Sequence, residues 1–297
     1  MTRTCVRAYR EGIAKFSTMN VLDIWYARLD EETLIASAPD ADARKKRQAI
    51  ADEAKESVGG YIFPKITQVH NGRRRLIDQL PLLYHPPPEE KIPENVLTPI
   101  ANYRETLPYE RRLLFNRYRI EDIAYKVVGV GSVGTRCGVA LFMAEENDSL
   151  FLQVKEAGPS VLEPYAGKTE FPHHGQRVVI GQRLMQSASD MMLGWTTSQK
   201  GIHFYIRQLR DMKYSPDVAS MTSLQLSRYA EICGLTLARA HARSGDASMI
   251  SGYLGKSDVF DKAIGTFAGL YAYQAERDCE RFLDAIQAGK ITADYKK

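Results

Sequence analysis

The sequence is poor in the features that mark several common protein classes. Its four cysteines, Cys5, Cys137, Cys233 and Cys279, lie far apart and form no C-x-x-C pair. They therefore offer neither a zinc-ligand spacing nor a disulfide framework, and no metal site is expected. No apolar run approaches the roughly 20 residues of a membrane span, and no signal peptide is recognisable. These absences favour a soluble protein of the reducing cytoplasm, with no membrane partner.

The chain also lacks a strong excess of charge of one sign. It has 40 basic and 36 acidic residues among 297, a formal charge of +4. Nucleic-acid binding needs clustered positive charge, and the short basic runs at 44–47 and 73–75 are typical of solvated surfaces. A nucleic-acid partner is therefore not expected. The hydrophobic share of 44% is that of an ordinary globular protein.

Hydrophobic periodicity and the positions of turn residues divide the chain into three predicted segments. Residues 1–93 are mainly helical, with a short hairpin around Asn71-Gly72 and a proline-rich linker at 85–93. Residues 94–213 form a β-rich lobe, and residues 214–297 are again helical. The pattern predicts helices at 41–57, 95–116 (interrupted near Pro108), 176–189, 222–241 and 258–288, and strands at 65–69, 73–77, 126–130, 137–143, 150–155 and 203–209.

A glycine-rich loop, Gly129-Val130-Gly131-Ser132-Val133-Gly134, joins two of these strands. In a dinucleotide-binding unit this G-x-G-x-x-G spacing opens into a helix, whereas here a strand, a turn and a third strand follow. That order is typical of a kinase glycine-rich loop, in which the backbone approaches phosphate closely. Ser132 would add a hydroxyl donor at the tip. A plain structural hairpin is the alternative.

The third strand supplies a lysine. By strand alternation Phe151, Gln153 and Lys155 share one face, and Leu150, Leu152 and Val154 the other. Lys155 can then lie beneath the glycine loop and neutralise phosphate charge.

A lysine in this position needs a carboxylate to hold it. Glu163 is the first choice, with Glu156 and Gln182 as fallbacks. The strand 203–209 would lead into the hinge, where the backbone of Gln208 and Leu209 would contact an adenine ring. Arg207 is equally consistent with an exposed strand end. The residues thus predict a site for ATP with Mg²⁺.

Several motifs resemble an uncharacterised bacterial family, domain of unknown function 2252. They are VRAYREGIAKFSTMNVLDIWYARL (6–29), VVGVGSVGTRC (127–137), LFLQVKEA (150–157), SVLE (160–163), GQRLMQSASD (181–190), YIRQLRDMK (205–213), LARAHARSGD (237–246) and GYLGKSDVFDKAI (252–264). The resemblance implies a fold like that of protein kinases or aminoglycoside phosphotransferases, acting on an unknown small-molecule or protein substrate.

The same resemblance implies that something is missing. Family members carry a G-D-x-H-x-x-N segment and an aspartate-rich D-F-x-D-F-D segment upstream, as if a kinase-like fold were circularly permuted. This chain is similar to the C-terminal two-thirds of such a member and lacks both segments. It is therefore expected to be truncated or inactive as a phosphotransferase, with a second copy or a partner supplying the missing part.

A linear alternative places the catalytic loop at His241 to Asp246, with Asp258 or Asp261 as the metal ligand. The asparagine expected five residues past the aspartate is Ser251, which favours helix-stop and N-cap roles instead.

The sequence as a whole predicts an α+β protein. Its small antiparallel kinase-like β lobe would bind an ATP-type nucleotide and lie between helical regions. The alternative function is a non-catalytic interaction or regulatory module in which the glycine hairpin is only structural.

Overall fold

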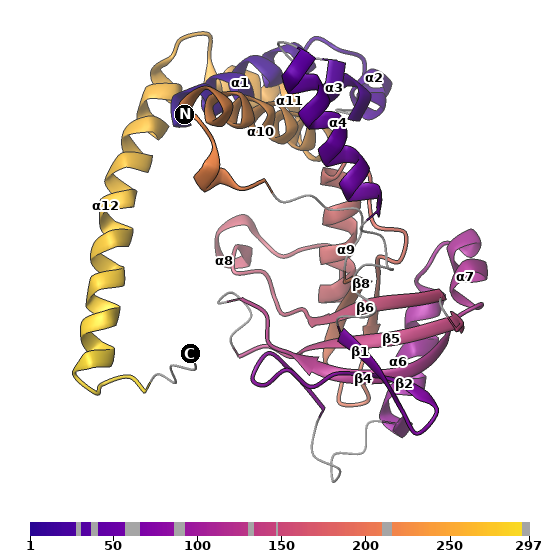
Figure 1. Cartoon of the computed structure of the whole chain (residues 1–297). Coiled ribbons are helices and arrows are strands. Elements are labelled where there is room, and N and C mark those ends of the chain that lie inside the picture. The colour runs from indigo at the N-terminus through magenta and orange to yellow at the C-terminus, as the bar shows by residue number, and fades with distance from the viewer. Residues whose placement is uncertain are drawn as a thin grey trace. The chain divides into compact units, whose positions relative to one another are not determined.

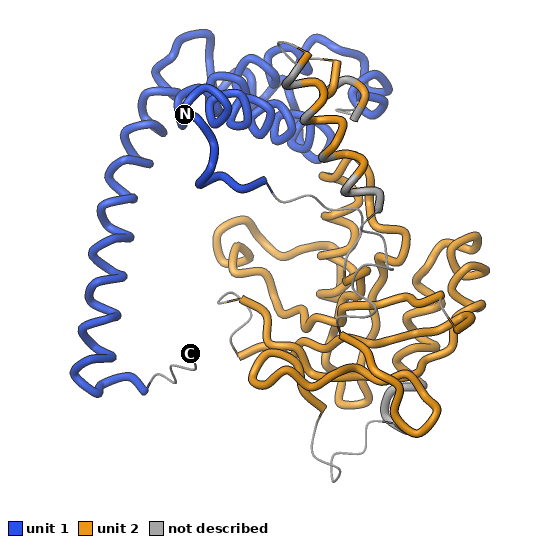
Figure 2. Tube along the Cα trace, in the orientation of Figure 1, with its two compact units in different colours: residues 1–28, 216–297 blue, residues 29–215 orange. Residues whose placement is uncertain are grey.

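A computed structural model describes residues 1–27, 31–36, 41–56, 66–85, 93–129, 134–146, 148–209 and 216–292. The chain has a mixed α+β fold, drawn in Figure 1. It divides into two compact units, coloured separately in Figure 2. Unit 1 consists of residues 1–28 and 216–297, and unit 2 of residues 29–215.

Unit 2 is built on an antiparallel sheet. Within the described residues the sheet has six strands in the order β3-β4-β5-β6-β8-β7. The strands are β3 (Leu83–Tyr84), β4 (Arg119–Lys126), β5 (Cys137–Glu145), β6 (Asp148–Glu156), β7 (Gly194–Thr197) and β8 (His203–Gln208). The helices of this unit are α3 (Glu31–Ala36), α4 (Ala41–Glu56), α6 (Pro93–Glu105), α7 (Tyr109–Phe115), α8 (Glu163–Ala166) and α9 (His174–Met185).

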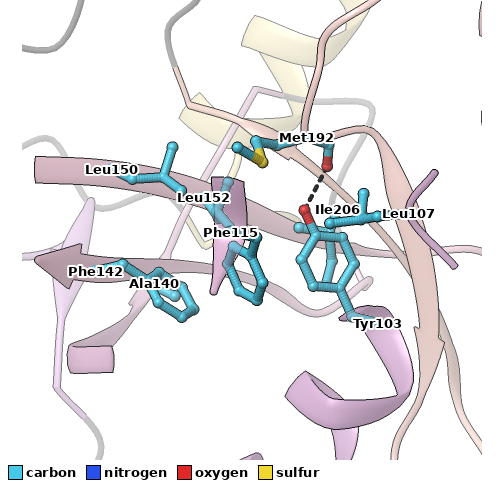
Figure 3. Close-up of a cluster of buried hydrophobic side chains, with 9 residues drawn as sticks. All are labelled: Tyr103, Leu107, Phe115, Ala140, Phe142, Leu150, Leu152, Met192 and Ile206. Carbon is cyan, nitrogen blue, oxygen red and sulfur yellow. Dashed lines mark hydrogen bonds between the residues drawn. The ribbon is translucent and has the colours of Figure 1, made fainter. Parts of the chain in front are cut away.

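One face of the sheet packs against α6 and α7. Tyr103 and Phe115 of these helices join Leu150, Leu152 and further side chains in a buried cluster (Figure 3). The Tyr103 hydroxyl donates to the Met192 carbonyl at 2.6 Å, so the one polar atom of this ring is satisfied. The alternation predicted for β6 holds here, since the even-numbered residues of the strand face this core.

The opposite face carries a second buried cluster. Phe151 packs there with Val139, Leu141 and Ala124, and Leu76 of a separate hairpin covers them. That hairpin, β1 (Thr67–His70) and β2 (Arg73–Leu76), pairs His70 with Arg73 across Asn71-Gly72. Asn71 and Gly72 have φ angles of 50° and 75°. Both values are positive, as a type I′ turn requires, and the predicted hairpin is confirmed.

The first strand of the lobe differs from its prediction. The sequence predicts a strand at 126–130, whereas β4 spans Arg119–Lys126. Glu121 and Asp122 obscured the strand pattern, because the register shifts at a bulge between Ile120 and Asp122. Asp122 is in fact a structural acceptor: its carboxylate accepts from the Leu76 backbone N–H at 2.7 Å and lies 2.9 Å from His85 Nε2. The helical segment predicted at 95–116 with an interruption near Pro108 is confirmed as two helices, α6 and α7, and Pro108 is the N-cap of α7.

Unit 1 is helical and combines the N-terminal segment of the chain with its C-terminal segment. It contains α1 (Thr2–Phe16), α2 (Val21–Tyr26), a 3₁₀ turn at Val218–Ser220, α10 (Ser223–Ser244), α11 (Ala247–Leu254) and α12 (Val259–Gln287). Helix α1 packs closely on α10, where a Cβ on Gly234 would lie 2.2 Å from the Cys5 carbonyl oxygen. Arg10 of α1 forms a bidentate ion pair with the buried Asp261 of α12, with Nη2 2.9 Å from Oδ2.

The predicted three-segment division stays a prediction, and residues 86–92 of its proline-rich linker lie outside the described residues. The local pattern of the sequence carried no sign that residues 1–28 pack with the C-terminal helices, because that contact joins residues more than 200 positions apart. No helix in the described ranges is long and apolar enough to cross a membrane.

Candidate functional site

The glycine-rich loop connects β4 to β5. Gly129 and Gly134 belong to the described residues, whereas Gly131 and Ser132 of the predicted tip lie outside them. Gly134 has a φ of 78°, a left-handed conformation that residues with a side chain rarely adopt. At least this glycine is therefore required by the path of the chain into β5.

Lys155 lies near the end of β6, in the middle of the sheet. It pairs with Cys137 of β5 on one side and with Tyr205 of β8 on the other. Directly paired residues share a face, so these three side chains project to the same side of the sheet. The Lys155 ammonium lies 6.0 Å from the centre of the Tyr205 ring.

Two further cations lie on this face. Arg207 is paired with Gln153, and Lys126 ends β4 beside Cys137. Burial raises the pKa of the Cys137 thiol, and the charges of Lys155, Lys126 and Arg207 act in the opposite direction. Among the described residues no carboxylate forms an ion pair with any of the three cations. Three cations thus gather around Cys137 on this face of the sheet.

Gln153 links these groups. It is buried, and its side-chain oxygen accepts from Nε and Nη2 of Arg207 at 3.3 and 3.2 Å. Its amide nitrogen donates to Cys137 Sγ at 3.8 Å. The amide thus has both ends bound, and it fixes the Arg207 guanidinium against the sheet.

Glu156 is hydrogen-bonded to Arg136, which lies between the glycine loop and β5. One carboxylate oxygen accepts from the Arg136 backbone N–H at 3.0 Å and from Arg136 Nη1 at 2.9 Å. These hydrogen bonds to Arg136 lower the pKa of Glu156. Because Glu156 directly follows Lys155, its side chain projects to the opposite face. Its contacts suit it to holding the base of the loop.

Glu163, the preferred partner of Lys155, begins the short helix α8. Its Oε1 accepts from the Ser160 backbone N–H at 3.4 Å. Within the part of the chain that is described, no ion pair joins it to Lys155. Gln182, a fallback partner of Lys155, lies on α9, which packs against β7 and β8. Helix α9 itself contains no acidic residue that could take this role. The role of each stays a prediction.

The backbone at the end of β8 is already hydrogen-bonded. The Gln208 N–H donates to Asp190 Oδ2, and the Leu209 N–H donates to the Phe151 carbonyl at 2.9 Å. The Leu209 side chain packs with the second core. An adenine in the predicted hinge would therefore need acceptor or donor groups other than these two N–H groups.

Sequence reasoning missed Asp190. It is buried, and besides Gln208 it accepts from the Met192 backbone N–H at 2.8 Å. It thus ties the turn before β7 to the end of β8. The sequence offers one sign of a buried structural role for Asp190: it follows Ser187-Ala188-Ser189 and directly precedes an apolar run.

The residues of the linear alternative have structural partners. Asp246 is the N-cap of α11 and accepts from the Met249 N–H at 2.9 Å. Asp258 pairs with Lys262 at 2.8 Å, and Asp261 with Arg10. His241 Nδ1 lies 2.9 Å from the Tyr9 hydroxyl. In the described ranges there is no group of three His, Cys, Asp or Glu residues that could hold a metal ion.

Comparison with known proteins gives one family. A family model described as an uncharacterized protein conserved in bacteria (DUF2252) matches residues 1–285. The match thus covers both units and nearly the whole chain, not only one part of it. No curated protein and no solved structure matches the chain.

Proposed function

The chain belongs to the DUF2252 family of bacterial proteins, and on that premise we propose that unit 2 binds an ATP-type nucleotide with its Mg²⁺ against the Lys155 face of the sheet. The observation that carries the proposal is Lys155 itself. It lies on β6, the second strand after a glycine-rich loop, and shares a face of the sheet with Lys126 of β4 and Arg207 of β8. None of these three cations has a carboxylate partner among the described residues.

The order of the elements supports a kinase-like lobe. A strand, the glycine loop, two further strands, two helices and two more strands follow one another as β4, β5, β6, α8, α9, β7 and β8. They pair in the order β4-β5-β6-β8-β7. In protein kinases a glycine-rich loop covers the phosphates and the lysine lies on the third strand. Lys155 is on the third strand in this count.

Each described residue would have a distinct part in binding. The Lys155 ammonium would neutralise phosphate charge, and the loop backbone near Gly129 and Gly134 would approach the phosphates. Glu156 would hold the base of the loop through Arg136. Mg²⁺ would neutralise charge on the β- and γ-phosphates when bound.

The proposal is tested by the thermal stability of the protein. A ligand that binds only the folded state adds about 2.7 kcal/mol at about 100 times its Kd. For a chain of this size we therefore expect Mg²⁺–ATP to raise the Tm by roughly 5 °C or more. Lys155→Met should abolish the rise, because it removes the charge and keeps the length of the side chain.

Lys200→Met is the matched control, since Lys200 is an exposed lysine in the turn between β7 and β8. It should keep the full response. If millimolar Mg²⁺–ATP leaves the Tm of the wild-type protein unchanged, the nucleotide proposal fails. The glycine hairpin would then be structural, as in an interaction or regulatory module.

A further inference from the structure

Three histidines meet where α9 begins. His173 is the N-cap of the helix, His174 is its first residue, and His203 is the first residue of β8. The rings of His173 and His203 are stacked, with centres 3.9 Å apart and planes inclined by 16°. The ring of His174 lies 5.2 Å from that of His203.

Two of these rings cap the helix through their acceptor nitrogens. His173 Nδ1 accepts from the Gln176 backbone N–H at 3.2 Å, and His203 Nδ1 accepts from the His174 backbone N–H at 3.1 Å. A nitrogen that accepts a hydrogen bond must be unprotonated. The proton of the neutral His173 ring is then on Nε2, which lies 3.0 Å from Thr197 Oγ1 and donates to it.

The helix begins in direct contact with β8. A Cβ on Gly175 would lie 2.3 Å from the Phe204 carbonyl oxygen. No other residue type fits there without moving the helix or the strand. The start of α9 therefore has little room to adjust if its caps are lost.

We propose that this pair of rings, His173 and His203, is an acid-sensitive latch that holds the N-terminus of α9 on β8. Protonation of either ring converts an acceptor into a donor that faces a backbone N–H. It also places positive charge at a helix N-terminus, where the helix dipole disfavours it. Protonation of both puts two charges in stacked rings.

The latch is hydrogen-bonded to the segment that directly follows β6, the strand that carries Lys155. The His203 carbonyl accepts from the Ala157 N–H at 2.9 Å, and Arg177 Nη2 of α9 donates to the Gly158 carbonyl at 3.0 Å. Ala157 and Gly158 lie two and three residues after Lys155. Regulation of nucleotide binding by the latch rests on the proposed function, whereas the opening of the latch does not.

His174 of α9 is the further titratable group that acts on both rings, and its charge lowers the pKa of His173 and of His203. Arg177 of α9 donates to the Gly158 carbonyl, the neighbours on β7 are the neutral Thr197 and Trp195, and Lys200 in the β7–β8 turn is exposed. Within the described residues no carboxylate pairs with these rings. A protonated ring would therefore gain no counter-charge from the described part of the chain.

The direction of the pH effect follows from burial. Burial lowers the pKa of His173, and the His203 ring lowers it further. Burial also lowers the pKa of His203, with a contribution from His174. An unfolded histidine has a pKa of about 6.5. The stabilisation is therefore complete above that pH, and it is lost as the pH falls towards the lower folded-state values.

Hydrogen exchange of the full chain tests the latch. Since pH 5.5 lies about one unit below the unfolded pKa, we expect the peptide 172–180 to lose protection between pH 7.5 and pH 5.5 by up to about tenfold for each ring, after correction for intrinsic rates. In His173→Asn/His203→Asn the loss should disappear, because asparagine accepts at an N-cap and does not titrate. His70→Asn, at an exposed histidine of β1, should respond as the wild type does.

Equal protection at both pH values in the wild type would overturn the latch, and so would an undiminished loss in the double variant. If that variant does not fold, an NMR titration of the wild type decides. The ring signals of His173 and His203 must then titrate together with the amide of Gln176, and independent titration overturns the proposal.

A second measurement separates the latch from the nucleotide site. Acid should weaken Mg²⁺–ATP binding more in the wild type than in His173→Asn/His203→Asn. Equal weakening in both, with the exchange result intact, overturns regulation of the site by the latch. If no nucleotide binds at pH 7.5, the proposed function fails, and the exchange data alone decide the latch.

Discussion

Asp190 shows how a single buried group can decide the geometry of a site that lies beside it. Its two carboxylate oxygens accept from the N–H groups of Met192, in the turn before β7, and of Gln208, at the end of β8. Buried acceptors of this kind are worth more than exposed ones, because their loss leaves N–H groups without a partner away from water. The end of β8, where the hinge is predicted, depends on this carboxylate.

Asp190→Asn should destabilise unit 2. The new amide keeps one acceptor oxygen but turns an NH₂ group towards the other N–H, at a cost of about 1–3 kcal/mol. Urea unfolding measures the change as a lower midpoint at constant slope. Glu146→Gln, which changes an exposed carboxylate in the β5–β6 turn in the same way, should stay within about 0.5 kcal/mol of the wild type. Equal midpoints for all three proteins would show that Asp190 does not organise the strand end.

At the scale of an element, the packing of helix α10 on α1 likewise depends on a single residue. Its Gly234 lies where α1 crosses it, and the Cys5 carbonyl oxygen occupies the space of a side chain. Alanine is the better helix former by about 1 kcal/mol. At this position, however, a methyl group must push the two helices apart.

We expect Gly234→Ala to lower the free energy of unfolding of unit 1 by about 1–3 kcal/mol, the usual cost of overpacking. Gly269→Ala in α12 is the matched control, because nothing lies within 4 Å of the Cβ it would add. That substitution should raise stability by up to about 1 kcal/mol. Chemical unfolding followed by circular dichroism distinguishes the two, and equal effects of both substitutions would exclude a close crossing of α1 and α10.

The elements that the sequence predicts well are those with a clear period. Strands β5, β6 and β8 and helices α10 and α12 lie within a few residues of their predicted bounds. Strand β7 was missed because Gly194–Thr197 is too short to show alternation. For the candidate site, alternation alone placed Gln153 and Lys155 on one face. It could not place Arg207 and Lys126 beside them, because cross-strand register is set by contacts far apart in the sequence.

At the scale of the whole molecule, both units belong to one family. The family match at residues 1–285 includes the lobe with Lys155 and the helical unit made from the two chain ends. The lobe is therefore not an independent module joined to unrelated helices. Variants that test the proposed nucleotide binding, or any further chemistry, should therefore be made in both units.

The acidic residues of unit 1 give the last prediction. Asp246 lies in a segment that superficially suggests a catalytic loop, but its carboxylate caps α11 through the Met249 N–H. We expect Asp246→Ala to cost about 1 kcal/mol of stability, as the loss of an N-cap does. It should leave any phosphate release from Mg²⁺–ATP unchanged at temperatures well below the Tm. Asp217→Ala, which removes the exposed cap of the 3₁₀ turn at Val218–Ser220, serves as the control. If turnover is lost in Asp246→Ala alone while ATP still raises the Tm, Asp246 acts in catalysis and its capping bond is secondary.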